Sequence, residues 1–458
     1  MANIKFGTDG WRAILGEDFN EENFTLVTNA IGKYVADTKG LDKVIVIGYD
    51  PRKSADEYAK KCAEILSKKG FTVKLSDKII PTPILAYYAG ITNSCAIMFT
   101  ASHNPPEYLG MKFMPEYAGP ATDDITSQIV TNIGKELPNT DGGQLIKMNL
   151  SNIYTDGISD LIDFERIKSA NIPFIFDGFY SATIGYFDKI LEYYNIPCKT
   201  MRMEHDSNFG GGMPDPKPKY LKPLMEYCKE HAVIGFANDG DGDRFGVIDE
   251  NGNYVSPNEI ISILAKHLKE NKKMSGAVVK TVGSSILIEK IAQKLELKIV
   301  ETAVGFKHIG QAMRDNETII GGEESGGLSI GGHIPEKDGI LANLLILEAI
   351  AYSGKKLTEL CADLYDFVGE KFYTDRNDYK LSDRNEINRI LEFYKNTKEI
   401  AGHSITRKNT IDGVKLYIDN STSILIRPSG TEPLLRVYFE CANREILEKL
   451  KNFNYIGC

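Results

Sequence analysis

Several features that define large classes of protein are missing from this 458-residue chain. No apolar run approaches the roughly 20 residues that a membrane-spanning helix needs, so we expect no membrane partner. The first ten residues lack the apolar core of a secretion signal, and a cytoplasmic location is therefore expected. The formal net charge is −9, whereas nucleic-acid binding requires a basic face, so we expect no nucleic-acid partner.

Paired cysteines are missing as well. The seven cysteines stand singly, with neither a C-x-x-C pair nor the spacing of a zinc site. Isolated cysteines of this kind are typical of small core residues in a reducing compartment. We therefore assign no chemistry to any of them.

The composition is that of a large globular protein. Hydrophobic residues make up 42% and charged residues 26% of the chain, which is neither a disordered nor a fibrous composition. A chain of 458 residues is too long for one ordinary core, and domain-size statistics suggest about three or four domains. An anionic substrate of this acidic protein would need a local cluster of arginine and lysine side chains.

A cluster of three aspartates is the clearest chemical motif. Asp239, Asp241 and Asp243 alternate with glycines that let the backbone curl. Carboxylates at this spacing form a compact set of hard oxygen ligands of the kind that binds Mg²⁺ or Ca²⁺. The motif therefore predicts a site for a divalent cation.

The same spacing occurs in the calcium-binding loop of EF-hands, and Glu250 stands at the twelfth position counted from Asp239. Arg244, however, occupies the place where that loop needs glycine. The flanking segments 232–237 and 245–248 are typical of strands, whereas an EF-hand needs a helix on each side. We therefore set the EF-hand aside.

A serine stands in a second polar segment, Thr100-Ala101-Ser102-His103-Asn104-Pro105. By itself such a segment is most often a plain turn, because asparagine and proline favour turn geometry. Beside a bound cation, however, Ser102 could carry a phosphoryl group whose charge the cation would neutralise during transfer. Together the two motifs suggest phosphoryl transfer through serine.

Alternating strands and helices give these motifs equivalent positions. Strands expected at 95–99, 232–237 and 318–320 lead into the serine segment, the aspartate cluster and the glycine-rich loop 321–327. Open α/β sheets bind ligands at the carboxyl ends of their strands, so the three loops could face one cleft. An ordinary glycine-rich connector is the alternative for the third loop.

The pattern changes after a helix-rich stretch at 341–364. A smaller α+β unit is indicated by strands expected at 416–419, 423–426 and 435–439. The loop before the last strand offers a guanidinium, hydroxyls and a glycine amide, which are the donors that bind phosphate. They belong to Arg427, Ser429, Gly430 and Thr431. A plain hairpin turn with a surface arginine is the alternative.

With these motifs in place, the chain closely resembles the α-D-phosphohexomutases, the phosphoglucomutase and phosphomannomutase group. The resemblance covers nearly the whole chain, and the motifs stand in the family's order. They are 7–12 (GTDGWR), the serine segment with 110–112 (GMK), the aspartate cluster, 305–307 (GFK), 322–326 (GEESG) and 427–433 (RPSGTEP).

The resemblance implies an α/β fold of four domains around a central cleft. Three similar α/β domains with mixed sheets would precede a smaller C-terminal α+β domain. The expected domains are 1–150 for the phosphoserine, 151–255 for the metal, 256–366 for the sugar and 367–458 for the phosphate.

The resemblance also implies a role for each motif. Ser102 would be phosphorylated, and an oxygen of its phosphoryl group would bind Mg²⁺ together with Asp239, Asp241 and Asp243. Catalysis by proton transfer or by electrostatic clamping would fall to Arg12, His103, Lys112 and Arg244. The sugar would contact Gly305, Lys307, Glu323, Ser325 and Lys337. The phosphate that is not reacting would contact Arg427, Ser429, Gly430 and Thr431.

The implied reaction interconverts glucose 1-phosphate and glucose 6-phosphate through a phosphoserine and glucose 1,6-bisphosphate. Two departures from the family pattern bear on the sugar. Leu109 stands where many relatives have asparagine, and Gly327 stands where mannose and glucosamine relatives usually carry histidine. Glucose phosphate is the first expectation and dual specificity for glucose and mannose the second, in a monomer or a homodimer.

Two other classes of function stay open. A metal-dependent phosphoserine phosphatase would release phosphate to water, but it would not need a second phosphate grip at Arg427. A non-catalytic sugar-phosphate sensor would bind without turnover, but it would be expected to have lost Ser102 or one of the aspartates. Both therefore rank below the mutase.

Overall fold

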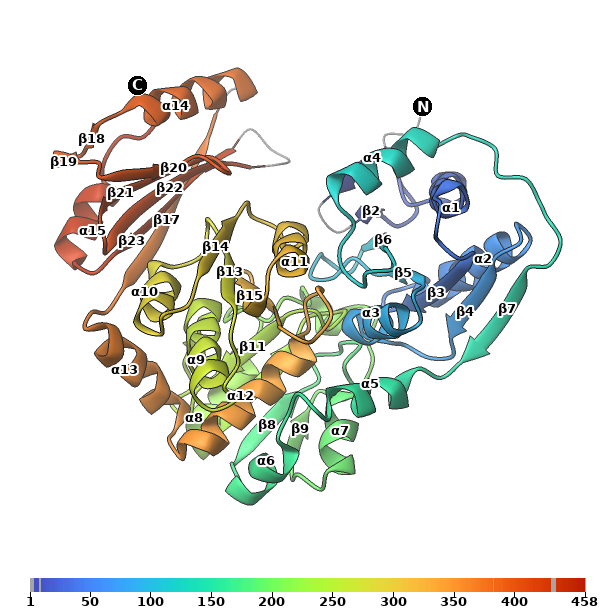
Figure 1. Ribbon diagram of the computed structural model, residues 1–458, viewed down its shortest axis with the longest axis horizontal. Helices are drawn as coiled ribbons and strands as arrows, with labels where there is room; N and C mark the ends of the chain where they lie inside the picture. Colours follow the sequence, from blue (N-terminus) through green and yellow to red (C-terminus); the bar gives the residue numbers. More distant parts are fainter. Residues whose placement is uncertain (1–3, 8–9, 382, 430–433, 458) are drawn as a thin grey trace.

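The structure is a computed structural model that describes residues 4–7, 10–381, 383–429 and 434–457. Four main sheets with their helices follow one another along the chain (Figure 1). The first lies on the right of the view, the second at the bottom, the third near the centre and the last at upper left. In the described part of the chain, no helix is both long and apolar enough to cross a membrane.

The first unit is built on a mixed sheet of seven strands. In sheet order these are β1 (Phe6–Gly7), β2 (Gly10–Ile14), β6 (Tyr108–Met114), β5 (Cys95–Phe99), β3 (Val44–Tyr49), β4 (Thr72–Ser76) and β7 (Gln144–Met148). Strands β5, β3, β4 and β7 are parallel, and the other three continue the sheet in antiparallel pairing. Its helices are α1 (Glu21–Asp37), α2 (Ala55–Ser67), α3 (Thr82–Ile91) and α4 (Asp123–Asn132).

Helix α5 (Ser151–Ile158) leads into the second unit, whose sheet has five strands. They are β12 (Tyr254–Val255), β11 (Phe245–Ile248), β10 (Ile234–Asn238), β8 (Phe174–Asp177) and β9 (Lys199–Met201). The sheet is mixed, because β10, β8 and β9 are parallel and β11 is antiparallel to β10. The helices are α6 (Phe164–Ala170), α7 (Phe187–Tyr193), α8 (Lys222–His231) and the 3₁₀ turn η1 (Phe209–Gly211).

The third unit has a mixed sheet of four strands. They are β14 (Ile299–Thr302), β13 (Ala277–Thr281), β15 (Thr318–Glu323) and β16 (Gly327–Ile330), of which the last is antiparallel. Its helices are α9 (Pro257–Glu270), α10 (Ile286–Lys294), α11 (Phe306–Asp315), α12 (Gly339–Ser353) and α13 (Leu357–Val368).

The C-terminal unit has an antiparallel sheet of five strands. They are β17 (Tyr373–Lys380), β23 (Leu434–Cys441), β22 (Thr422–Pro428), β21 (Val414–Asp419) and β20 (Arg407–Asn409). Helices α14 (Arg384–Asn396) and α15 (Arg444–Lys451) and the short hairpin of β18 (Glu399–Ile400) and β19 (His403–Ser404) complete it. The predicted fold class is confirmed, because three α/β units with mixed sheets precede a smaller α+β unit.

Helix α12 fixes the second and third units to one another. It is apolar on every side and is buried along nearly its whole length, as expected for a helix inside a core. It packs against β10 and β11 of the second unit and against α9 and β16 of the third. Asp338 caps its first turn by accepting the N–H of Leu341 at 2.9 Å. The loop just before α12 is therefore held rigidly next to the aspartate cluster.

Two segments differ from the prediction. The sequence pattern predicts a strand that ends at Ile320, whereas β15 continues to Glu323, because Glu323 pairs with Gly327 across a tight hairpin. The segment around Lys112 is grouped with the serine loop by its sequence, but it lies in β6, where Lys112 pairs with Met98 of β5. Both differences arise from antiparallel partners that the local sequence does not show.

Candidate active site

The aspartate cluster lies in the turn between two buried strands. β10 ends at Asn238 and β11 begins at Phe245, and Asp239, Asp241 and Asp243 are each at most 1% exposed. One carboxylate oxygen from each aspartate lies within 4.8 Å of the other two. The structure therefore gathers all three carboxylates in one place.

Two glycines allow this turn to approach its neighbours closely. A β-carbon at Gly240 would lie 2.8 Å from the carbonyl oxygen of Ser102. At Gly242, where φ is +78°, a β-carbon would lie 2.5 Å from Cγ2 of Thr183. Because no side chain fits at either position, glycine lets the aspartate turn pack directly against the serine segment.

The electrostatics of the cluster favour a bound cation. Burial, and then the charges of Asp241 and Asp243, raise the pKa of Asp239 well above its usual range. Oδ2 of Asp241 accepts a hydrogen bond from Oγ1 of Thr82 at 2.6 Å, whereas its buried Oδ1 has no hydrogen-bond partner among the described residues. Buried carboxylate oxygens, one of them unsatisfied, fit Mg²⁺ as a hard cation.

Ser102 lies directly against this cluster. It is 2% exposed, and its Oγ donates a hydrogen bond to Oδ2 of Asp239 at 2.7 Å. Nδ1 of His103 lies 3.3 Å from the same Oγ. The φ of Ser102 is +50°, a left-handed value that residues other than glycine rarely adopt, and such strain is concentrated at functional sites.

Two arginines lie beside these loops. Nη1 of Arg12 donates a hydrogen bond to Oδ1 of Asn104 at 2.8 Å, which places it next to the serine segment. Burial acts to lower the pKa of Arg244, but the charges of Asp239 and Asp243 outweigh it and raise that pKa. The buried Nε of Arg244 has no hydrogen-bond partner in the described part of the chain, so it is a donor that an anionic substrate could use.

Lys112 belongs to a buried group of four charges. Its Nζ lies 3.1 Å from Oδ2 of Asp243 and 3.2 Å from Oε2 of Glu336. Nζ of Lys337 lies 3.1 Å from the same oxygen of Asp243. Two lysines and two carboxylates therefore balance one another at the edge of the aspartate cluster, as buried charges must.

Glu336 and Thr82 lie at this site, although neither is among the residues predicted for it. The signal for Glu336 was the run of charged residues just before the apolar helix α12. Thr82, at the start of α3, donates both its backbone N–H and its hydroxyl to Asp241. No local pattern could have identified Thr82, because 159 positions separate it from its partner.

The structure brings Glu323 and Ser325 together in the β15–β16 hairpin. Oγ of Ser325 donates a hydrogen bond to Oε1 of Glu323 at 2.6 Å. Burial raises the pKa of Glu323 to about 7, although the nearby Lys337 acts to lower it. Glu324 instead accepts a hydrogen bond from Oγ1 of Thr281 at 2.6 Å. The two adjacent glutamates therefore have different partners, and Glu323 is the one near Lys337.

Gly327 leaves room for the side chain of Lys337. A β-carbon at Gly327 would lie 2.4 Å from Cδ and 2.7 Å from Cγ of Lys337. Lys337 is 1% exposed, so its stem is fixed by the packing around it. The space next to Glu323 that a larger residue at 327 would need is therefore filled by the Lys337 stem.

Gly305 and Lys307 lie at the start of α11. Gly305 is the N-cap residue and has a φ of +118°, which favours glycine. Nζ of Lys307 forms an ion pair with Asp123 of α4 at 2.6 Å, and this pair joins the third unit to the first. A sugar contact by Lys307 would require this ion pair to be shared or broken.

Arg427 and Ser429 lie at the end of β22 in the C-terminal unit, whereas Gly430 and Thr431 lie outside the described residues. Nε of Arg427 donates to Oδ2 of Asp412 at 2.8 Å, and the same oxygen accepts the N–H of Val304 at 3.1 Å. These described contacts do not reach the serine segment. In Figure 1 the C-terminal sheet lies across the third unit from the first sheet.

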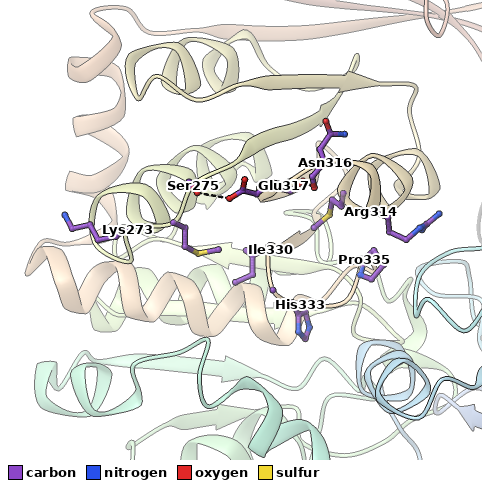
Figure 2. Close-up of a pocket in the computed structure, with 13 residues that line it drawn as sticks. Lys273, Ser275, Arg314, Asn316, Glu317, Ile330, His333 and Pro335 are labelled. Carbon is purple, nitrogen blue, oxygen red and sulfur yellow. Dashed lines mark hydrogen bonds between the residues drawn. The ribbon is translucent and has the colours of Figure 1, made fainter.

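A separate pocket of about 630 Å³ lies on the third unit (Figure 2). It is found at the end of β15 and β16 opposite the Glu323 hairpin, where Ser275 donates a hydrogen bond to Glu317 at 2.8 Å. Arg314 and His333 also line it. None of the residues predicted for the site lines this pocket, so it is distinct from the serine and aspartate loops.

Comparisons with known proteins agree with this arrangement. Four phosphoglucomutase/phosphomannomutase models match the chain: α/β/α domain I at residues 3–140, domain II at 152–252, domain III at 256–367 and the C-terminal domain at 382–455. The matches follow the order of the four units in the structure.

Individual relatives span nearly the full length. A Thermococcus kodakarensis protein named phosphoglucomutase/phosphomannomutase is 30% identical over 454 residues, which cover 96% of this chain and 95% of that protein. A phosphoglucosamine mutase of Clostridium botulinum is 30% identical over 468 residues, with 97% and 96% covered. A solved Thermus thermophilus structure, assigned as a phosphomannomutase, has a TM-score of 0.86 at 28% identity and covers 98% of this chain and 97% of its own. The chain belongs to the phosphoglucomutase/phosphomannomutase family and is a phosphohexomutase.

Proposed function

We propose that the protein interconverts glucose 1-phosphate and glucose 6-phosphate through a phosphoserine at Ser102. The observation that carries the proposal is the buried hydroxyl of Ser102, which lies 2.7 Å from Asp239 in the cluster of three aspartates. Phosphoryl transfer depends mainly on positioning and on neutralising the charge of the transferred group. The hydrogen bond to Asp239 would position Oγ of Ser102, and a cation bound by the aspartates would neutralise the charge.

The proposed reaction has two transfers that mirror each other. In the first, the 6-hydroxyl oxygen of glucose 1-phosphate attacks the phosphorus of the phosphoserine. A P–O bond to the sugar forms as the bond to Oγ of Ser102 breaks, while the attacking hydroxyl loses a proton and Oγ gains one. Glucose 1,6-bisphosphate then reorients, and Oγ attacks the phosphorus at the 1-position. Glucose 6-phosphate leaves, the phosphoserine is restored, and no phosphate is released to water.

The aspartates would hold Mg²⁺ in this reaction. Asp239, Asp241 and Asp243 supply buried carboxylate oxygens close together, and Oδ1 of Asp241 has no other partner among the described residues. Bound there, Mg²⁺ would neutralise charge on the phosphoryl group as it transfers. Arg244 and Arg12 would donate hydrogen bonds to oxygens of the same phosphoryl group.

Lys112 and His103 are our candidates for the proton movements. Nδ1 of His103 lies 3.3 Å from Oγ of Ser102, within one small shift of a short hydrogen bond. The ammonium of Lys112 is held between Asp243 and Glu336, which suits it to donate hydrogen bonds to the phosphoryl group. We propose that Lys112 clamps the phosphoryl charge and that His103 or Lys112 returns a proton to Oγ.

The two ends of the substrate need different partners. Glu323 and Ser325 would hydrogen-bond the sugar hydroxyls, with Gly305, Lys307 and Lys337 beside them. A single loop must grip whichever phosphate is not reacting, in either orientation of the sugar. We assign this role to Arg427, Ser429, Gly430 and Thr431.

Because Arg427 is tied through Asp412 to the loop before Gly305, movement of the C-terminal unit would close the sugar and phosphate contacts together.

Glucose is our first choice of sugar. By the family resemblance, Gly327 stands where mannose and glucosamine relatives usually carry histidine, and the Lys337 stem occupies the space that such a side chain would need. The named relatives make mannose 1-phosphate and glucosamine 1-phosphate the rival substrates. Epimeric hydroxyls change only one or two contacts, so a dual preference for glucose and mannose is the second candidate.

Turnover of the three sugar 1-phosphates tests the proposal. Each is supplied with Mg²⁺ and a trace of the matching bisphosphate, and both the 6-phosphate and inorganic phosphate are followed. We expect the highest kcat/KM for glucose 1-phosphate, without phosphate release. A higher kcat/KM for another sugar would overturn the choice of glucose. Stoichiometric release of phosphate would identify a phosphatase, and tight binding without turnover would identify a sensor.

A further inference from the structure

A buried ion pair next to the serine segment has no part in the reaction described so far. Asp50 and Arg52 follow β3 directly and are 1% and 3% exposed. Nε of Arg52 lies 3.3 Å from Oδ2 of Asp50, and both side chains are fully buried. A buried arginine is expensive to desolvate unless its five donors are used, so its partners indicate what it does.

Those partners are carbonyl oxygens of the serine segment and of the first residue of β6. Nη2 of Arg52 donates hydrogen bonds to the carbonyl oxygens of Ser102 and Asn104, both at 2.6 Å. Nη1 donates to those of Pro105 at 2.8 Å and Tyr108 at 3.0 Å. One guanidinium therefore binds four carbonyl oxygens between Ser102 and the start of β6.

Asp50 holds the backbone N–H of Ser102 through Thr100. Its Oδ2 accepts a hydrogen bond from Oγ1 of Thr100 at 2.6 Å. That Oγ1 in turn accepts the backbone N–H of Ser102 at 2.8 Å. The N–H of Ser102 is thus fixed through Thr100 to Asp50, while its carbonyl oxygen is fixed to Arg52.

This double attachment accounts for the unusual backbone of Ser102. A serine with a φ of +50° keeps that conformation only when its surroundings determine it. The conformation directs Oγ toward Asp239. Lysine could not replace Arg52, because a single ammonium lacks the planar fork that reaches four oxygens at once.

We propose that the Asp50–Arg52 pair is a positioning clasp, which sets Oγ of Ser102 against Asp239 for phosphoryl transfer without touching the substrate. The inference rests on the proposed function, since it assigns the pair a role in that reaction. It predicts that loss of the guanidinium fork slows the chemical step and leaves sugar binding largely intact.

The test compares Arg52→Lys with a matched control, Arg202→Lys. Arg202, which follows β9, forms a similar pair in the second unit, where its Nε donates to Oδ1 of Asp177, the last residue of β8, at 2.9 Å. Arg52→Met, which removes the charge as well, shows whether charge alone matters. The three variants and the wild type are compared in thermal stability, kcat, KM and the single-turnover rate from the phosphorylated enzyme.

We expect Arg52→Lys to lower kcat and the single-turnover rate by about 100-fold, the loss that misplacement by roughly 1 Å produces. KM should stay close to the wild-type value. The kcat of Arg52→Met should lie below that of Arg52→Lys by no more than a small factor. Arg202→Lys should keep nearly full activity. If both lysine variants lose stability to a similar extent and both keep kcat, the pair is only structural and the proposal is wrong.

Hydrogen exchange separates this inference from the proposed function. The amide of Ser102 should exchange at least about tenfold faster in Arg52→Lys than in the wild type, because its opening becomes less costly. Arg202→Lys should leave that amide unchanged. This result would support the clasp even if the wild type showed no mutase turnover, which would refute only the proposed function. Unchanged exchange at Ser102 in Arg52→Lys would overturn the clasp itself.

Discussion

Replacement of Asp241 by asparagine should make the metal-free protein more stable and inactive at once. Asp241 is fully buried, and one of its oxygens lies within 4.8 Å of oxygens of Asp239 and Asp243. With an effective dielectric constant of about 20, two like charges roughly 4.8 Å apart repel by about 3.5 kcal/mol. An asparagine removes this repulsion and can still accept the hydrogen bond of Thr82.

The net gain should be smaller than the repulsion between one pair of charges. The raised pKa of Asp239 already relieves part of the repulsion, and Arg244 offsets more of it. We therefore expect the free energy of unfolding of the Asp241→Asn variant to rise by about 1–2 kcal/mol without metal. For a domain of about 100 residues each kcal/mol corresponds to roughly 4–8 °C in Tm.

The assay is thermal unfolding in a chelator and in millimolar Mg²⁺, together with turnover. Mg²⁺ should raise the Tm of the wild type and leave that of Asp241→Asn unchanged. The kcat of the variant should fall by at least about 100-fold, because it loses the charge stabilisation that the metal ion would supply. Asp249→Asn is the control, because Asp249 accepts backbone N–H groups of Asn251 and Asn253 in the same unit. It should lower Tm and keep the Mg²⁺ response. A lower Tm of Asp241→Asn in chelator, or an undiminished response to Mg²⁺, would refute the reasoning.

Three further predictions concern Glu323, Gly327 and Glu336. The folded pKa of Glu323 is raised to about 7, so its contribution to stability is complete below about pH 4.5 and is lost as the pH rises through about 7. Urea unfolding should therefore give Glu323→Gln a free energy of unfolding up to roughly 3 kcal/mol above that of the wild type near pH 8, and little difference near pH 4.5. Equal pH profiles of the two proteins would contradict this. Gly327→Ala should lower the free energy of unfolding by about 1–3 kcal/mol, because the new methyl group displaces the Lys337 stem. In a double-mutant cycle, Lys337→Ala should restore part of that loss, and additive effects would count against the contact. Glu336→Gln should lower the free energy of unfolding by about 3–5 kcal/mol, because it removes one of the negative charges that balance the buried ammonium of Lys112. An unchanged Tm in thermal unfolding would show that Glu336 does not stabilise Lys112.

The parts of the site that the sequence predicts are those whose residues are neighbours in the chain. The alternation of aspartate and glycine at 239–243 specifies a turn with clustered carboxylates wherever the strands lie. The strand that ends before Ser102 and the strand that ends before Asp239 could also be predicted, because each is a short apolar run followed by polar residues. What local pattern could not show is that Gly240 packs directly against the carbonyl of Ser102.

The residues that the sequence does not predict act across long distances in the chain. Arg52 contacts a loop about fifty positions away, and Thr82 contacts Asp241 across 159 positions. Their chemistry is ordinary for a buried arginine and a helix-start threonine, so only the tertiary structure assigns them a role. The ion pair between Lys307 and Asp123 is similar, because it depends on how the third unit packs against the first.

The central claim is that Ser102 carries the phosphoryl group, and the fate of that group tests it most directly. The protein is incubated with isotopically labelled glucose 1,6-bisphosphate and Mg²⁺, and the labelled residue is located by peptide mass spectrometry. Unlabelled glucose 1-phosphate is then added, and the label is followed into sugar phosphate and inorganic phosphate. The account predicts one phosphoryl group on Ser102, its transfer to sugar without inorganic phosphate, and neither labelling nor turnover in Ser102→Ala. Phosphorylation at another residue, or sustained turnover by Ser102→Ala, would contradict it.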